Sequence, residues 1–197
     1  MRWKSSGDRY GAVATMIHWL TAFAVIGLLI SGLVIAGETD PAAKAALLRV
    51  HVPMGVLVLV LTITRVAWWM FFDQRPDAVT SGSAVQTMAA KIVHIAFYPL
   101  LLAVAASGVA MIALSGAAAV LFFGATGPLP DFWAYAPRAP HMVFAYALIG
   151  LIVLHIAAAL FHQFIKRDGL LARMGLFAWP KGSSTTRPTM RTVTSRH

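Results

Sequence analysis

Cysteine is absent from this sequence of 197 residues. Its absence excludes disulfides, cysteine-ligated zinc, iron–sulfur clusters held by thiolates and the covalent attachment of a c-type haem. Any metal or cofactor must therefore be held by other side chains. Histidine, which occurs seven times, is the expected ligand.

Acidic residues are also few: seven Asp and Glu stand against 16 Lys and Arg, which gives a net charge of +9. A positive excess can indicate nucleic-acid binding, but these basic residues lie at the ends of apolar segments and form no patch interleaved with aromatic residues. We expect no nucleic-acid partner. The sequence also contains no glycine-rich phosphate loop and no motif for nucleophilic catalysis.

Apolar residues are abundant, at 59% of the chain, with a mean hydropathy of +0.74. A helix needs about 20 apolar residues to cross a bilayer, and four segments reach that length: 11–37, 46–72, 89–114 and 141–165. We therefore predict an all-α integral membrane four-helix bundle over residues 1–180. Asp40 should cap the second helix, with Pro41 at its first position. The apolar stretch 117–123 is too short to cross, and residues 181–197 should form a disordered basic tail.

The basic residues predict the orientation of the bundle. Sorted by loop, 13 Lys and Arg fall on the side of both termini and three on the other side, at positions 44, 49 and 138. Because basic residues favour the cytoplasmic side, both termini and the tail should be cytoplasmic. We expect membrane lipid to surround the four predicted spans.

Histidines inside membrane spans are rare and costly, so each one is a functional hypothesis. On the fourth segment, His141 and His155 are 14 residues apart, which places them about 40° apart around the helix and about 21 Å apart along it. His18 should match the depth of His155, and His51 the depth of His141. Two such pairs of neutral imidazoles are what two b-type haems need as axial ligands of iron.

Other uses of these histidines remain open. A lone histidine can bridge two helices by a hydrogen bond. Zinc usually needs three or four converging ligands, often with a carboxylate, and the predicted spans contain no Asp or Glu. His94 lies at the depth of His18 and is its substitute as a ligand. His94 and His162 are also candidates for a hydrogen bond to a haem propionate or for a quinone site, although a structural role is the simpler interpretation of each.

Two arginines are further candidates for cofactor binding. Arg65 lies 14 residues after His51, on nearly the same face but at the cytoplasmic end, where it should bond a propionate of the inner haem or extend to the lipid headgroups. Arg49, with Lys44 and Arg138, should form a positive mouth above the outer haem. That mouth would neutralise propionates and attract a small anion.

Several stretches resemble the bacterial cytochrome b561 family, whose members are four-helix di-haem membrane proteins. They are Arg9–Tyr10 with Ile17–Leu20, Arg49–Arg65, Lys91–Leu102 and His141–Met174. Carried over, the family's haem ligands fall on His18, His51, His141 and His155, the four residues that the depth argument selects. The resemblance further implies a location in the bacterial inner membrane, quinone reactivity, and electron transfer from superoxide to ubiquinone.

The resemblance therefore favours an oxidoreductase that moves electrons from a periplasmic donor, superoxide, to the quinone pool through two bis-histidine haems. The alternative is a membrane-anchor cytochrome b subunit that relays electrons for a partner dehydrogenase or hydrogenase. The short loops favour the first function, since they offer a partner little surface. A haem-free transporter or scaffold would instead be colourless.

Overall fold

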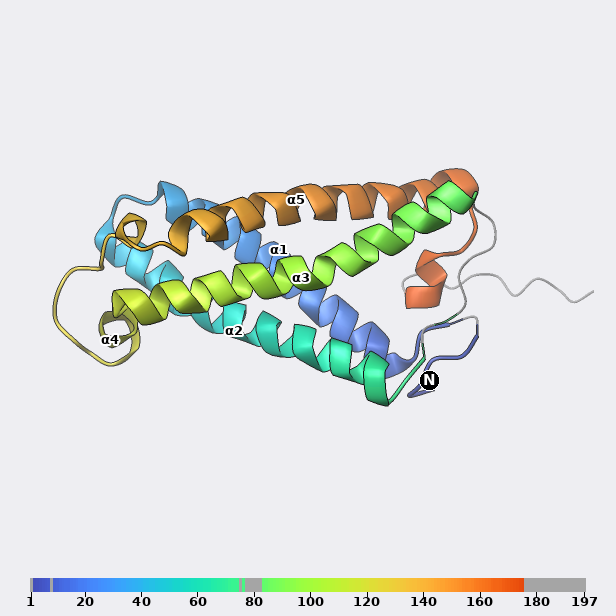
Figure 1. Cartoon of the computed structure of the whole chain (residues 1–197), viewed down its shortest axis with the longest axis horizontal. Coiled ribbons are helices and arrows are strands. Elements are labelled where there is room, and N and C mark those ends of the chain that lie inside the picture. The colour runs from blue at the N-terminus through green and yellow to red at the C-terminus, as the bar shows by residue number, and fades with distance from the viewer. Residues whose placement is uncertain (1, 8, 75, 77–82, 176–197) are drawn as a thin grey trace, which may run out of the picture.

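Four long helices run side by side along the length of the molecule (Figure 1). The computed structural model describes residues 2–7, 9–74, 76 and 83–175. The long helices are α1 (Ala12–Gly37), α2 (Pro41–Phe71), α3 (Ala84–Ser115) and α5 (Arg138–Leu160). All four are long and apolar enough to cross a membrane, which confirms the predicted all-α architecture and the four spans. The predicted tail, 181–197, lies outside the described residues.

Short elements gather at the two ends of the bundle (Figure 1). One end carries α4 (Ala117–Phe122) and the 3-10 turn η1 (Phe132–Ala134), and we call it the outer end, following the orientation predicted from the sequence. The other end carries the N-terminal segment, the π-helical turn η2 (Phe161–Lys166) and the 3-10 turn η3 (Leu171–Met174), and we call it the inner end. The apolar stretch 117–123 thus forms a short helix, α4, that packs on α2 and α3.

Polar caps extend the helices beyond their apolar segments. Asp40 accepts hydrogen bonds from the backbone N–H groups of Ala42 and Ala43, which confirms the predicted cap with Pro41 in the first turn. Ser83 and Gln86 form a capping box at the start of α3. These two helices therefore begin before residues 46 and 89, the first residues of the predicted apolar segments. The helix α5 also begins early, at Arg138.

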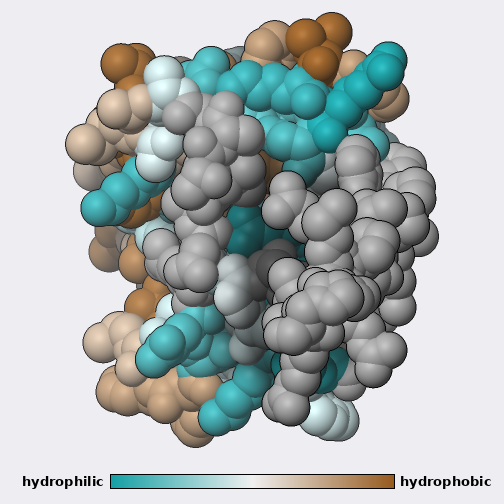
Figure 2. Space-filling model, turned by 90° about the vertical axis from the view of Figure 1, so that its right-hand side faces the viewer, coloured by the Kyte–Doolittle hydropathy of each residue, from teal (hydrophilic) through white to brown (hydrophobic). Residues whose placement is uncertain are grey.

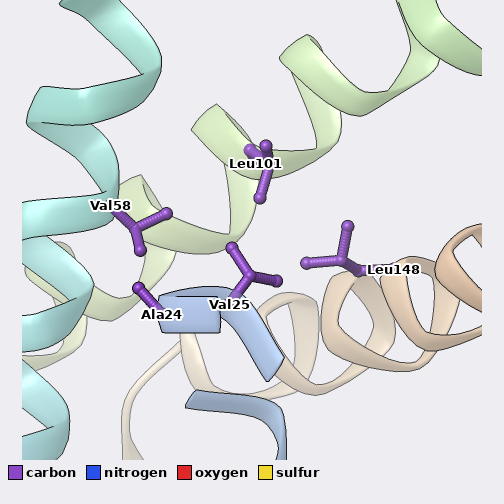
Figure 3. Close-up of a cluster of buried hydrophobic side chains, with 5 residues drawn as sticks. All are labelled: Ala24, Val25, Val58, Leu101 and Leu148. Carbon is purple, nitrogen blue, oxygen red and sulfur yellow. The ribbon is translucent and has the colours of Figure 1, made fainter. Parts of the chain in front are cut away.

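A small apolar core occupies the middle of the bundle, and each long helix contributes to it (Figure 3). Its buried members are Ala24, Val25, Val58, Leu101 and Leu148. Two buried hydroxyls flank this core, and both are satisfied within their own helices. Thr21 donates to the carbonyl of Ile17, and Thr62 donates to that of Val58, each at 2.7 Å. The centre of the bundle is thus apolar, with its few polar atoms bonded to backbone.

The outward faces of the long helices carry large apolar side chains that no part of the described chain covers. Phe23, Val60 and Val153, for example, expose more than half of their surface. Hydrophilic residues gather instead at the inner end, which Figure 2 shows face on, with apolar residues towards its rim. This distribution fits a bundle whose sides contact lipid and whose ends contact water.

Asp73, just after α2, ties the N-terminal segment to the inner end. Its carboxylate accepts the backbone N–H of Ser5 at 3.0 and 3.1 Å and the Ser5 hydroxyl at 2.8 Å. It also accepts the indole N–H of Trp68 at 3.1 Å. Burial raises the pKa of Asp73, but the hydrogen bonds from Ser5, Trp68 and Gln74 lower it further, so the net pKa lies below its ordinary value.

We expect Asp73→Asn to loosen the N-terminal segment, because an amide accepts these hydrogen bonds more weakly than a carboxylate does. Hydrogen exchange at residues 2–7 should become faster at neutral pH. In the wild-type protein the stabilisation should be present above the unfolded-state pKa of about 4 and lost as the pH falls through the lower folded-state pKa. Gln74→Ala is the control, since Gln74 contributes its backbone N–H. Equal exchange rates in wild type and Asp73→Asn would contradict this role.

Candidate functional site

The outer half of the bundle brings His51 of α2 and His141 of α5 together. The centroids of their rings are 6.5 Å apart, and the ring planes are inclined by 68°. Each ring is held through Nδ1 by a neighbouring helix. The Nδ1 of His51 lies 2.9 Å from the hydroxyl of Ser31 on α1. The Nδ1 of His141 lies 2.9 Å from the carbonyl oxygen of Val104 and 3.1 Å from the hydroxyl of Ser107, both on α3.

A cavity of about 460 Å³ surrounds these two rings. All four long helices line it, and several lining positions are glycines, namely Gly32, Gly55 and Gly108. Lys44, Arg138 and Asp131 also lie on its wall. Its size falls in the range of small-molecule and cofactor sites. The outer half therefore offers two imidazoles in an apolar cavity with a net positive charge on its wall.

The inner half of the bundle brings three histidines together. The ring centroids of His94 on α3 and His155 on α5 are 5.2 Å apart, with the planes inclined by 87°. Phe97 packs on the ring of His155 in the same edge-to-face way, at 5.4 Å. His18 on α1 lies close enough to interact electrostatically with both His155 and His94. The Nδ1 of His94 donates to the backbone carbonyl of Ala90 at 2.7 Å.

Arg65 of α2 completes the inner cluster. Its Nη1 donates to the Nδ1 of His18 at 2.8 Å. Its Nε is buried and has no hydrogen-bond partner among the described residues. A buried guanidinium N–H without an acceptor carries a desolvation cost, so this atom is a fit for an anionic group of a ligand.

The two clusters lie in opposite halves of the bundle, and the apolar core lies between them. Leu148 of that core is seven residues from His141 and seven from His155. Two turns of helix, about 10 Å, therefore separate it from each cluster. The predicted depths of the histidines agree with this arrangement.

The other predicted site residues have different surroundings. The Nε of Arg49 donates to the carbonyl of Leu121 at 2.9 Å, at the end of α4, and Arg49 is not among the described residues that line the outer cavity. His162 lies in η2 at the inner end, where its Nδ1 is 2.5 Å from the carboxylate of Asp168. The structure thus brings His94 into the inner cluster and leaves His162 outside it.

Ser31 and Ser107 are site residues that the sequence did not predict. Serine is common in helices packed inside membranes, so its presence alone does not indicate a functional site. A retrospective signal is the dipeptide Ser-Gly, which occurs at 31–32 and again at 107–108, within predicted spans. Among the described residues, no three His, Cys, Asp or Glu side chains converge as ligands of one metal ion.

Comparison with known proteins gives one family and several relatives. A family model described as prokaryotic cytochrome b561 matches residues 9–175. Cytochrome b561 homolog 2 of Escherichia coli (strain K12) is 31% identical over 180 residues, which cover 88% of this chain and 95% of that protein. Cytochrome b561 homolog 1 of the same organism is 28% identical, covering 85% and 97%. The probable superoxide oxidase CybB of Yersinia pestis is 26% identical, covering 84% and 95%.

The surroundings of Arg65 generate a prediction about the inner haem expected from the sequence. Arg65→Gln should lower the midpoint potential of that haem, because it removes a positive charge that favours the reduced iron. The outer haem should keep its potential. Arg65→Lys is the matched control and should shift the inner potential less, since it keeps the charge. A redox titration followed by visible absorption measures both potentials, and two unshifted potentials in Arg65→Gln would contradict an electrostatic role of Arg65 at the inner haem.

Proposed function

Because the chain belongs to the prokaryotic cytochrome b561 family, we propose that it transfers electrons across the bacterial inner membrane, from superoxide on the outer side to ubiquinone. The family implies b-type haem, and the chain is a membrane electron carrier of this kind. The observation that carries the proposal is the presence of one histidine cluster in each half of the bundle. Two clusters provide sites for two redox centres between the two sides of the membrane.

The outer cluster fits a haem. His51 and His141 come from different helices and face one cavity, and the glycines of its wall leave room for a flat macrocycle. We assign these two residues as the side chains that would hold the iron of the outer haem. When bound, a haem supplies an iron that alternates between its ferric and ferrous states and so passes single electrons. The protein's part is to hold the two imidazoles, exclude water and set the charge nearby.

The inner cluster contains three histidines, whereas one haem iron needs only two histidine ligands. We assign His155 and His18 as ligands, the pair that the family resemblance implies, with His94 as the substitute that lies beside His155. A guanidinium only donates, so the Nδ1 of His18 accepts from Arg65. Coordination through Nε2 requires that proton on Nδ1 instead. Arg65 must therefore release His18, and its buried Nε then suits a propionate.

The wall of the outer cavity suits a small anionic donor. Lys44 and Arg138 carry two positive charges there against the one negative charge of Asp131. One relative is named a probable superoxide oxidase, which supports superoxide as the donor. In the balanced reaction, two superoxide anions each lose one electron and become dioxygen. Ubiquinone takes these two electrons with two protons and becomes ubiquinol.

The inner end is where we place the acceptor. Both ends of the described chain lie there (Figure 1), together with most of the described Lys and Arg residues, and by the positive-inside rule this supports a cytoplasmic location for that end. His162 and Asp168 form a hydrogen-bonded pair at this end, outside the haem clusters. Such a pair can hydrogen-bond a quinone oxygen and pass it a proton.

The ligand assignment predicts two groups of variants. His51→Ala and His141→Ala should each remove the outer haem and so halve the haem content. His18→Ala and His155→Ala should each remove the inner haem, and His94→Ala should keep both. Quantitative haem analysis with a redox titration shows which potential disappears. Loss of the inner haem in His94→Ala, with retention in His18→Ala, would make His94 the ligand, and a wild-type protein without haem would refute the proposed function.

The charge on the cavity wall predicts the kinetics of superoxide oxidation. In the variant with both Lys44→Gln and Arg138→Gln, superoxide should reduce the outer haem more slowly at low ionic strength, and high salt should narrow the difference from wild type. Arg49→Gln removes one positive charge away from the cavity wall and should slow the reaction less than Lys44→Gln or Arg138→Gln does alone. Pulse radiolysis measures the rate, with ubiquinol formation as the overall readout. Equal slowing by Arg49→Gln would contradict attraction at the cavity wall.

A further inference from the structure

The dipeptide Ser-Gly lies against each histidine of the outer pair. Ser31–Gly32 of α1 faces His51 of α2, and Ser107–Gly108 of α3 faces His141 of α5. The two contacts belong to the two closely packed helix pairs, α1 with α2 and α3 with α5. The same local arrangement therefore serves both rings of the outer cavity.

The hydrogen bond that Ser31 makes within its own helix favours one tautomer of His51. A serine hydroxyl has one proton, and Ser31 donates it to the carbonyl of Leu28 at 3.1 Å. Its oxygen can then only accept from the Nδ1 of His51, 2.9 Å away. His51 thus carries its proton on Nδ1. In a neutral ring this leaves Nε2 with the lone pair that a metal ion requires.

The same reasoning fixes His141. The carbonyl of Val104 accepts hydrogen bonds and cannot donate, so the Nδ1 of His141, 2.9 Å away, must carry the proton. The Ser107 hydroxyl donates to the same carbonyl at 2.9 Å and lies 3.1 Å from that Nδ1. His141 therefore has two acceptors for one proton, whereas His51 has the single hydroxyl of Ser31.

At His141 the glycine of the dipeptide allows the ring to come this close. A Cβ added to Gly32 would lie 3.4 Å from Cε1 of His51, and one added to Gly108 would lie 3.1 Å from Cε1 of His141. The second contact is tighter than most side chains tolerate. Ser107–Gly108 thus combines an acceptor for Nδ1–H with a backbone that leaves space for the ring, whereas a side chain at Gly32 would only reach ordinary contact with His51.

We propose that Ser31 and Ser107 are positioning residues that lock both outer histidines in the tautomer for coordination through Nε2 and that Ser31 lowers the redox potential of the outer haem. This inference rests on the proposed function. A hydrogen bond from Nδ1–H raises the basicity of the ring as a ligand, and a more basic ligand favours ferric iron. Because His51 depends on one acceptor, Ser31 should have the larger effect. Ser107 should have the smaller one, since Val104 keeps its carbonyl.

The test is a redox titration of four serine variants in the haem-loaded, full-length protein. Ser31→Ala should raise the midpoint potential of the outer haem and leave the inner haem unchanged. Ser107→Ala should raise the outer potential less, and Ser31→Thr, which keeps the hydroxyl, should restore the wild-type value. Ser115→Ala is the matched control, because Ser115 donates to a backbone carbonyl three residues earlier, as Ser31 does, but contacts neither histidine in the described structure. It should shift neither potential.

The remaining outcomes of the titration distinguish a failure of the role of Ser31 from a failure of the proposed function. Normal haem content with an unshifted outer potential in Ser31→Ala overturns the role of Ser31 and leaves the proposed function intact. Loss of the outer haem in Ser31→Ala supports that role if Ser31→Thr retains the haem, and overturns it if Ser31→Thr loses the haem too. A wild-type protein that binds no haem overturns the proposed function as well.

Discussion

An imidazole inside a bilayer gives up its hydrogen bonds to water, and this protein replaces them with bonds to its own helices. Two of the replacement bonds join neighbouring helices and leave each ring its Nε2: Ser31 with His51, and Val104 with His141. The first connects α1 to α2, and the second connects α3 to α5. Because those are the two closely packed helix pairs, the contacts that satisfy the rings also hold the helices in register.

The architecture could be predicted because a bilayer leaves an apolar chain few alternatives. Hydrocarbon thickness sets the length of each span, and all four segments were found. The helix ends could be placed less well. The first turns of α2 and α3 are capped by Asp40 and by Ser83, and they lie outside the most apolar windows. Hydropathy measures where a helix meets lipid, whereas caps decide where the helix begins.

The depth of each histidine in the membrane could be predicted from the sequence, but the rotation of each helix about its own axis could not. Counting residues placed His51 level with His141, and their rings are neighbours. The rotation of each helix about its axis is hidden when all of its faces are apolar, since no polar side marks the direction of water. The approach of His94 to His155 therefore could not be specified, nor could the role of Ser31. Arg49 is a different case: it is five residues from Lys44, about 140° around α2, so the helical period already separates the two side chains, and Arg49 bonds Leu121 instead of lining the cavity.

The apolar core between the two clusters is also a barrier to protons and other ions. Its described buried members, among them Val58, Leu101 and Leu148, are apolar and carry no titratable group that could pass on a proton. An electron can tunnel through such a layer, so charge would cross the centre of the bundle without a compensating ion. Inward electron transfer of the proposed kind is therefore electrogenic and works against a membrane potential that is negative inside. Each electron carried across the full potential costs about 2.3 kcal/mol per 100 mV. The driving force of the redox reaction must exceed this cost, so the membrane voltage itself sets how far the reaction proceeds.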